Sequence, residues 1–176
     1  METKQCQLQG VPRMTEGAAD LAPLPLRSQI RLALKRRLNP GVKRRLKARY
    51  SALFRRLAQI TGKGKPLPAQ TSAAAANLGA GDLVRVRSRG EIQATLDAWG
   101  EFKRCLFMED MWPYCGTTQK VLKRVERFVD ERDYKVKKAS GVVLLEGVIC
   151  QGTPLFGRCD RCCFYFWREE WLEKVD

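Results

Sequence analysis

Apolar positions in the first third of the chain recur at helical spacing. One set, four residues apart, predicts a helix over 28–39 that begins at Ser28 and ends before Pro40, and it consists of Ile30, Leu34 and Leu38. A second set has spacings of three and four and consists of Val42, Leu46, Tyr50, Leu53, Leu57 and Ile60. It predicts an amphipathic helix of about 20 residues. Together the two sets predict a helical hairpin.

The pattern changes to that of strands after residue 81. Apolar and basic residues alternate from Val84 to Arg87, which predicts a half-exposed strand, and Ser88 with Glu91 forms a capping box for a short helix. Further strands are expected at 119–129, 134–137, 141–150 (the central one) and 164–167. This number of short strands predicts a small antiparallel barrel. The expected fold class is therefore α+β, a basic helical arm followed by a barrel.

These patterns divide the chain into four parts. Residues 1–26 are expected to be disordered and 27–62 to form the basic helical hairpin. Residues 63–80 are rich in Gly, Pro, Ala and Ser and predict a flexible linker. Residues 81–176 then form a separate domain that contains six of the seven cysteines.

The charge is concentrated in the basic hairpin. The chain has 33 Lys and Arg against 19 Asp and Glu, a net charge of +14. Residues 27–65 hold 14 basic residues, and no acid occurs between Leu21 and Gly81. The candidate polyanion-binding residues are Arg36, Arg37, Lys43, Arg44, Arg45, Lys47, Arg49, Arg55 and Arg56.

Several partners fit such a segment. Basic helices can neutralise nucleic-acid phosphates or contact an acidic protein, and a basic helix with an apolar face is also typical of binding to an anionic membrane surface. The alternative is that the apolar stripe packs in a core and leaves a solvated basic face. No apolar run reaches about 18 residues and no secretory signal is seen, so we expect a cytoplasmic protein.

The absence of histidine narrows the chemistry. It excludes Ser-His-Asp and Cys-His catalysis and histidine metal ligands. The cysteines can still bind metal: Cys115, Cys150, Cys159 and either Cys162 or Cys163 predict a tetrahedral thiolate site. Zinc is the expected metal, with an iron–sulfur cluster as the alternative. The simpler interpretation, buried cysteine as a small hydrophobe, is favoured for Cys105.

A metal site saturated by four thiolates has no position for a substrate. We therefore expect a non-enzymatic, metal-stabilised module whose basic helices contact a polyanion. The alternatives are an iron–sulfur or thiol redox accessory of a biosynthetic enzyme and a peripheral membrane binder. A reactive thiolate at Cys162 or Cys163 would be favoured by Arg158 and Arg161, which would lower its pKa.

Several stretches of the C-terminal half resemble an SH3-like, KOW-type barrel family of bacterial proteins of unassigned function that carries a four-cysteine cluster. They are Gly81-Asp82-Leu83-Val84-Arg85-Val86, Phe107-Met108 before Tyr114-Cys115-Gly116, Leu145-Glu146-Gly147 before Cys150, and Cys159 with Cys163 before Phe166-Trp167-Arg168-Glu169. The resemblance covers about residues 81–175 and omits the basic arm. It implies a metal-binding fold, no established activity, and Cys163 as the fourth ligand.

Overall fold

The chain divides into two units in a computed structural model of residues 1–176. The model describes residues 25–37, 42, 45, 46, 49, 50, 77–131, 133, 135–153 and 157–175. One unit is formed by Leu21–Ala69, and the other contains Gln70–Asp176. The boundary lies within the segment that the sequence predicts to be a linker. Residues 63–76 of that linker and residues 1–24 lie outside the described residues.

Helix α2 (Leu26–Arg37) is the described helix of the first unit. The sequence predicts a start at Ser28, but the helix begins two residues earlier, because the carbonyl of Pro25 accepts hydrogen bonds from the N–H groups of Ser28 and Gln29, at 2.8 and 3.1 Å. Of the second predicted helix, only residues 42, 45, 46, 49 and 50 are described, and these are helical. Among the described residues, no helix has the length and apolar run needed to cross a bilayer.

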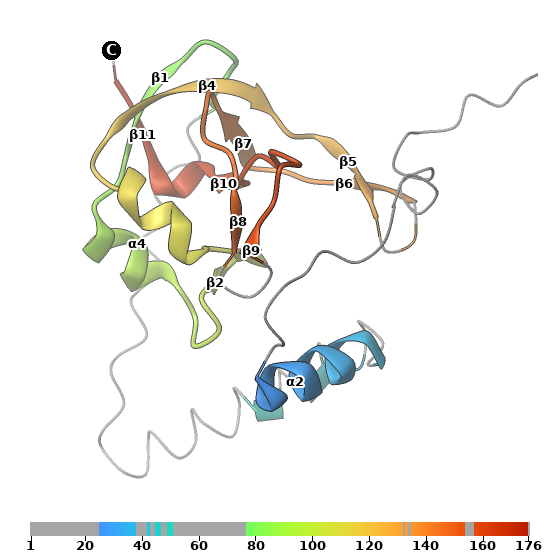
Figure 1. The fold of residues 1–176 in the computed structure, drawn as a ribbon. Helices are drawn as coiled ribbons and strands as arrows, with labels where there is room; N and C mark the ends of the chain where they lie inside the picture. The colour runs from blue at the N-terminus through green and yellow to red at the C-terminus, as the bar shows by residue number, and fades with distance from the viewer. Residues whose placement is uncertain are drawn as a thin grey trace, which may run out of the picture. The chain divides into compact units, whose positions relative to one another are not determined.

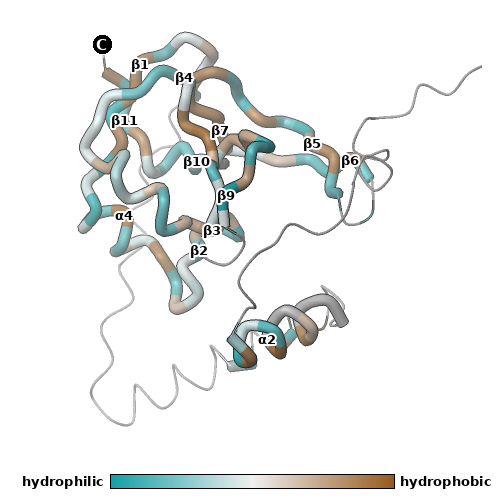
Figure 2. The backbone as a smooth tube through the Cα atoms, viewed as in Figure 1, coloured by the Kyte–Doolittle hydropathy of each residue, from teal (hydrophilic) through white to brown (hydrophobic). Residues whose placement is uncertain are grey.

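A five-stranded antiparallel sheet is the framework of the second unit (Figure 1). Its strands follow the order β10-β7-β4-β1-β11. Their bounds are β1 Leu83–Val86, β4 Thr118–Arg124, β7 Val142–Leu145, β10 Trp167–Arg168 and β11 Leu172–Lys174. Strand β1 confirms the predicted alternation, because Val84 and Val86 are fully buried while Leu83 and Arg85 are exposed. In Figure 2, which colours the backbone by hydropathy, hydrophobic and hydrophilic stretches both occur along β4 and β5.

Three short hairpins accompany the sheet. They are formed by β2 (Glu101–Phe102) with β3 (Cys105–Leu106), β5 (Arg127–Asp130) with β6 (Lys135–Lys138), and β8 (Gly152–Thr153) with β9 (Gly157–Arg158). The β5–β6 hairpin extends away from the sheet in Figure 1. Helix α4 (Arg89–Thr95) begins with the predicted capping box: Ser88 Oγ accepts from the Glu91 N–H at 3.4 Å, and Glu91 accepts from the Ser88 N–H at 2.9 Å. Two 3₁₀ helices, η2 (Glu109–Tyr114) and η3 (Glu169–Trp171), complete the unit.

The prediction of a closed barrel is wrong for this fold. Closure requires the two edge strands to be hydrogen-bonded to each other, whereas β10 and β11 are paired on one side only, with β7 and β1. The three residues of η3 connect β10 to β11 along the chain. They turn the chain at the point where barrel closure would require β10 and β11 to be hydrogen-bonded to each other. The result is an open sheet with added hairpins, and the expected fold class is corrected accordingly.

The predicted central strand is also displaced. The apolar run 141–150 forms a strand only over Val142–Leu145, because Gly147 adopts a φ of +69° and turns the chain. The centre of the sheet is β4, which pairs with β1 on one side and β7 on the other. The apolar run therefore predicted an inner strand correctly, but the turn at Gly147 makes that strand shorter than predicted.

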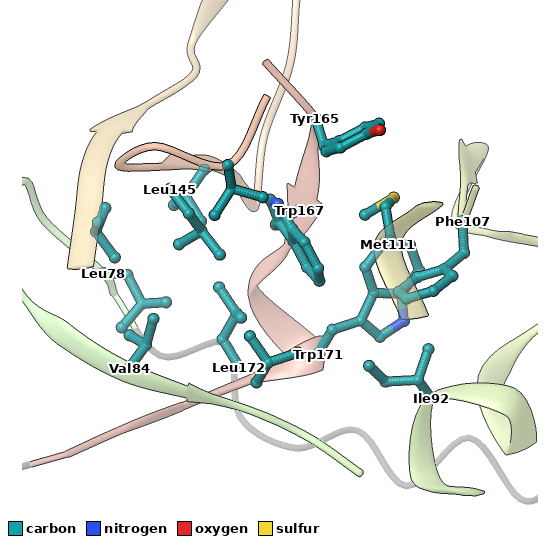
Figure 3. Close-up of a cluster of buried hydrophobic side chains, with 14 residues drawn as sticks. Leu78, Val84, Ile92, Phe107, Met111, Leu145, Tyr165, Trp167, Trp171 and Leu172 are labelled. Atoms are coloured by element: carbon teal, nitrogen blue, oxygen red, sulfur yellow. The ribbon is translucent and has the colours of Figure 1, made fainter. Parts of the chain in front are cut away.

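Aromatic side chains fill the core of the second unit (Figure 3). Trp167 and Trp171 are both 0% exposed, and Phe107 meets each of them edge-on, with ring centroids 5.8 and 5.1 Å apart. Trp171 Nε1 donates to Thr95 Oγ1 at 3.0 Å, which ties α4 to the core. Large buried aromatic surfaces of this kind dominate the stability of a small domain.

Candidate functional site

Cys150, Cys159 and Cys163 lie at one end of the second unit. Ile149 and Phe164 form an antiparallel bridge, and the Cys150 N–H donates to the Cys163 carbonyl at 2.7 Å. The β8–β9 hairpin then brings the chain back, so that the Cys159 N–H donates to the Gln151 carbonyl at 2.8 Å. Backbone pairing therefore assembles three of the four predicted ligand residues.

Glycine is required inside this hairpin. Gly152 has a φ of +132°, and a Cβ at that position would lie 2.1 Å from the Gly157 carbonyl oxygen. Any other residue would push β8 and β9 apart. The close approach of the two strands thus depends on Gly152, and with it the position of Cys159 beside Cys150.

The thiols of this group influence one another. Burial raises the pKa of the Cys163 thiol, and the neighbouring Cys159 and Cys150 raise it further, against the opposing effect of Arg161. The sequence predicted that arginine would lower this pKa, but burial outweighs the arginine charge. Arg161 is itself engaged by the carboxylate of Glu131 at 2.5 and 2.7 Å.

Cys150 is the half-buried member of the group and is held by polar contacts. Its Sγ accepts from the Gly152 N–H at 3.4 Å. It also forms a hydrogen bond with Tyr165, whose pKa is raised mainly by burial and further by that bond. Figure 3 shows Tyr165 at the margin of the core, with its hydroxyl oxygen turned away from Trp167.

Cys115 is not part of this group. It follows η2, and its N–H donates to the Trp112 carbonyl at 3.1 Å. The influences on the pKa of its thiol are burial, which raises it, and Arg89, which opposes this; no other cysteine is among them. Its side chain packs against the apolar core.

The prediction that the chain is a metal-binding protein is therefore corrected. Among the described residues, no group of three or more cysteine, histidine, aspartate or glutamate side chains is placed to hold a metal ion. Of the four residues that the sequence selected, Cys115 and Cys150 both pack against the core, while Cys159 and Cys163 are exposed. This arrangement does not support classifying the chain as a metal-binding protein. Zinc or an iron–sulfur cluster as a cofactor stays a prediction.

The two remaining described cysteines behave differently from this group. The Cys105 thiol donates to the Phe166 carbonyl at 3.4 Å, and burial raises its pKa to about 11, as expected for a structural cysteine. Cys162 is exposed and has a φ of +53°, a conformation that few residues other than glycine adopt. This left-handed position reverses the chain just before Cys163.

An open cavity of about 510 Å³, with polar and apolar walls in similar shares, adjoins the three-cysteine end. It is lined by Asp110, Tyr114, Ile149, Gln151, Gly152, Thr153, Gly157, Arg158 and Tyr165. The sequence did not predict it, because its walls come from η2, the β8–β9 hairpin and the residue after Phe164. The only local signal was the tyrosine before Cys115.

Buried charges near η3 were also missed. Arg168 and Glu170 are 9% and 8% exposed and form an ion pair at 3.1 Å, and Lys103 approaches Glu170 at 2.5 Å. Glu169 is 1% exposed and its Oε1 lies 3.1 Å from Arg124 Nη2. This is the only partner of the Glu169 carboxylate among the described residues. Arg168, Glu170 and Lys103 compensate one another inside the fold, whereas neither carboxylate oxygen of Glu169 has a hydrogen-bond partner among the described residues.

The described part of the basic segment is limited. Arg45 and Arg49 are helical and exposed, and Arg36 and Arg37 belong to α2. The other candidate residues lie outside the described residues, namely Lys43, Arg44, Lys47, Arg55 and Arg56.

Comparison of the chain with protein-family models, curated proteins and solved structures gave no match. The resemblance to an SH3-like family is therefore untested.

Proposed function

We propose that the protein binds a polyanion, the phosphate backbone of nucleic acid, through its basic segment 27–65. The observation that carries this proposal is the run of 14 Lys and Arg with no acid between Leu21 and Gly81. The segment itself contains no carboxylate that could neutralise these charges. Each phosphate that such a charge neutralises releases counterions, which favours binding at low salt.

Exposure of the described basic residues supports the proposal. Arg45 and Arg49 are four apart in a helical stretch and both are exposed, so they project from one side of the chain. Arg27 at the start of α2 is exposed as well. These side chains are accessible to a ligand as large as a nucleic-acid strand.

The charge pairing of the second unit supports the same assignment. Its basic side chains are commonly engaged by acids: Arg85 and Arg87 contact Glu173 at 2.5 and 2.6 Å, and Lys120 contacts Glu146 at 3.1 Å. Residues 66–176 hold 17 basic and 16 acidic residues. This unit therefore offers a phosphate strand much less net attraction than the basic segment does.

An anionic membrane surface is the second candidate, and the apolar side of α2 favours it. Leu26, Ile30 and Leu34 are 71%, 59% and 58% exposed. An exposed apolar stripe beside basic residues is the arrangement that lets a helix lie in a lipid headgroup layer. Nucleic-acid binding makes no use of this stripe.

The two candidates are separated by binding assays of the full chain at low salt. The probes are fluorescently labelled duplex DNA, single-stranded RNA and vesicles containing phosphatidylglycerol. We expect nucleic acid to bind and the Ile30→Gln/Leu34→Gln variant to bind it unchanged. Vesicle binding that this variant abolishes, with no binding of nucleic acid, would select the membrane. Binding to none of the three would refute both.

A further inference from the structure

Cys150 directly follows and Cys163 directly precedes the two residues of an isolated antiparallel bridge, Ile149 and Phe164. The bridge between Ile149 and Phe164 fixes the register, and the 2.7 Å hydrogen bond from the Cys150 N–H to the Cys163 carbonyl follows directly after it. In a regular antiparallel pair, residues at this position exchange two backbone hydrogen bonds and have Cα atoms about 5.5 Å apart. Here one of those bonds is formed, from the Cys150 N–H to the Cys163 carbonyl. Their side chains lie on the same face of the ladder.

This placement matches the requirements of a disulfide. Disulfide-linked residues most often have Cα atoms about 5.5–6 Å apart. Both residues are free thiols in the structure, Cys163 exposed and Cys150 half-buried. The charges that influence the pKa of the Cys163 thiol include Cys159 and, to a smaller extent, Cys150.

We propose that Cys150 and Cys163 are a redox-active pair that forms a reversible disulfide with a small disulfide such as oxidised glutathione as the oxidant. The thiolate of the exposed Cys163 attacks one glutathione sulfur, and glutathione thiolate leaves. The thiolate of Cys150 then attacks the Sγ of Cys163, which releases the second glutathione. The two protein protons pass to the two glutathione thiolates, so one disulfide is reduced while another is formed. This inference is independent of the polyanion proposal.

A disulfide between Cys150 and Cys163 would restrain one side of the cavity described above. It closes the loop 150–163, and this loop carries β8 and β9. Several cavity-lining residues belong to the same loop, among them Gln151, Gly152 and Arg158. Oxidation therefore joins the two ends of this loop covalently beside the cavity.

Peptide mapping tests the pair directly, because trypsin cuts after Arg158 and Arg161 and separates the cysteines. The full chain is reduced, incubated without air in excess glutathione disulfide, alkylated and digested. We expect the peptide Ala139–Arg158, which contains Cys150, to be linked to Cys162–Arg168, which contains Cys163. The tripeptide Cys159–Arg161 should be alkylated or carry glutathione.

Single variants assign the bond within the linked peptides. Cys162→Ser and Cys159→Ser should retain the link, whereas Cys163→Ser should abolish it completely. Cys115→Ser is the matched control and should leave it unchanged. Cys163→Ser changes an exposed side chain, and circular dichroism verifies that it folds.

Three results would overturn the proposal. They are the absence of any link in excess glutathione disulfide, a link through Cys159 or Cys162 in place of Cys163, and glutathione adducts without an intramolecular bond. Reversibility is checked by adding reduced glutathione in excess, which should restore two alkylatable thiols. A link that persists in the folded protein would show a structural disulfide and contradict an exchangeable pair.

Discussion

The basic segment and the second unit differ in what balances their charges. In the segment 27–65, 14 basic residues stand without an acid. In the second unit, even buried charges have partners, as Arg168 does in Glu170. The first arrangement has charge available for an external partner, whereas the second uses charge to fix its own fold. Charge therefore indicates binding in one region and architecture in the other, although the residue types are the same.

Loss of the aromatic core should produce the largest effect, and only in the second unit. Trp167 is fully buried, and its indole N–H has no hydrogen-bond partner among the described residues, so its contribution is packing. We expect Trp167→Ala to lower the free energy of unfolding by about 3–5 kcal/mol, measured by urea denaturation. Phe166→Ala, at a side chain that is 43% exposed, is the matched control and should cost about 1 kcal/mol or less. Equal losses would mean that the core is not centred on Trp167.

Breaking the buried ion pair should give the next largest effect. Arg168→Met leaves Glu170 with Lys103 as its remaining partner, at 2.5 Å. We expect a loss of about 2–3 kcal/mol in urea denaturation, somewhat below the usual cost of unpairing a buried charge. Arg85→Met, which breaks an exposed pair with Glu173, should cost less than about 1 kcal/mol. A smaller loss at Arg168 than at Arg85 would contradict the architectural role of these charges.

The same cluster predicts a pH dependence. Burial raises the pKa of Glu170, but Arg168 and Lys103 oppose it, and the net result is a pKa below its ordinary value of 4.5. A carboxyl whose pKa is lowered by folding stabilises the protein above its unfolded-state pKa. This stabilisation should be lost as pH falls below about 4.5 and through the lower folded pKa. Glu170→Gln should flatten that part of the stability curve, and an unchanged curve would exclude Glu170 as its source.

A smaller effect is expected at Cys115, and it tests the division of the cysteines. Because no other cysteine is among the groups that influence the pKa of the Cys115 thiol, Cys115→Ser should leave the metal content unchanged and cost about 1 kcal/mol or less. Elemental analysis and urea denaturation measure the two quantities. Loss of bound metal together with several kcal/mol of stability would restore the four-cysteine site.

Local patterns predicted local structure well. The alternation at Leu83–Val86 and the capping box of Ser88 and Glu91 both form as expected, because each depends on residues a few positions apart. The β2–β3 hairpin and η2 were missed. Lys103 and Arg104 turn that hairpin with positive φ, at 46° and 68°, without the glycine that normally marks such a turn.

Arrangement over long sequence distances was predicted less well. Barrel closure depends on how β10 and β11 meet around η3, and no local pattern encodes that contact. The cysteines illustrate the same limit: the ladder at Ile149 and Phe164 unites three of them, whereas Cys115 follows η2 onto the core. Spacing identified residues able to ligate a metal but not which of them meet.

The most direct test of the central claim is the salt dependence of nucleic-acid binding by two matched double variants. Arg45→Gln/Arg49→Gln removes two charges from the basic segment, and Arg127→Gln/Lys138→Gln removes two exposed charges from the β5–β6 hairpin. Each phosphate contact contributes roughly 0.9 to the slope of log Kobs against log salt on duplex DNA. We predict that the first variant reduces the slope by up to about 2 and that the second leaves it unchanged. Equal slopes in the two variants, or binding that does not depend on salt, would contradict the account.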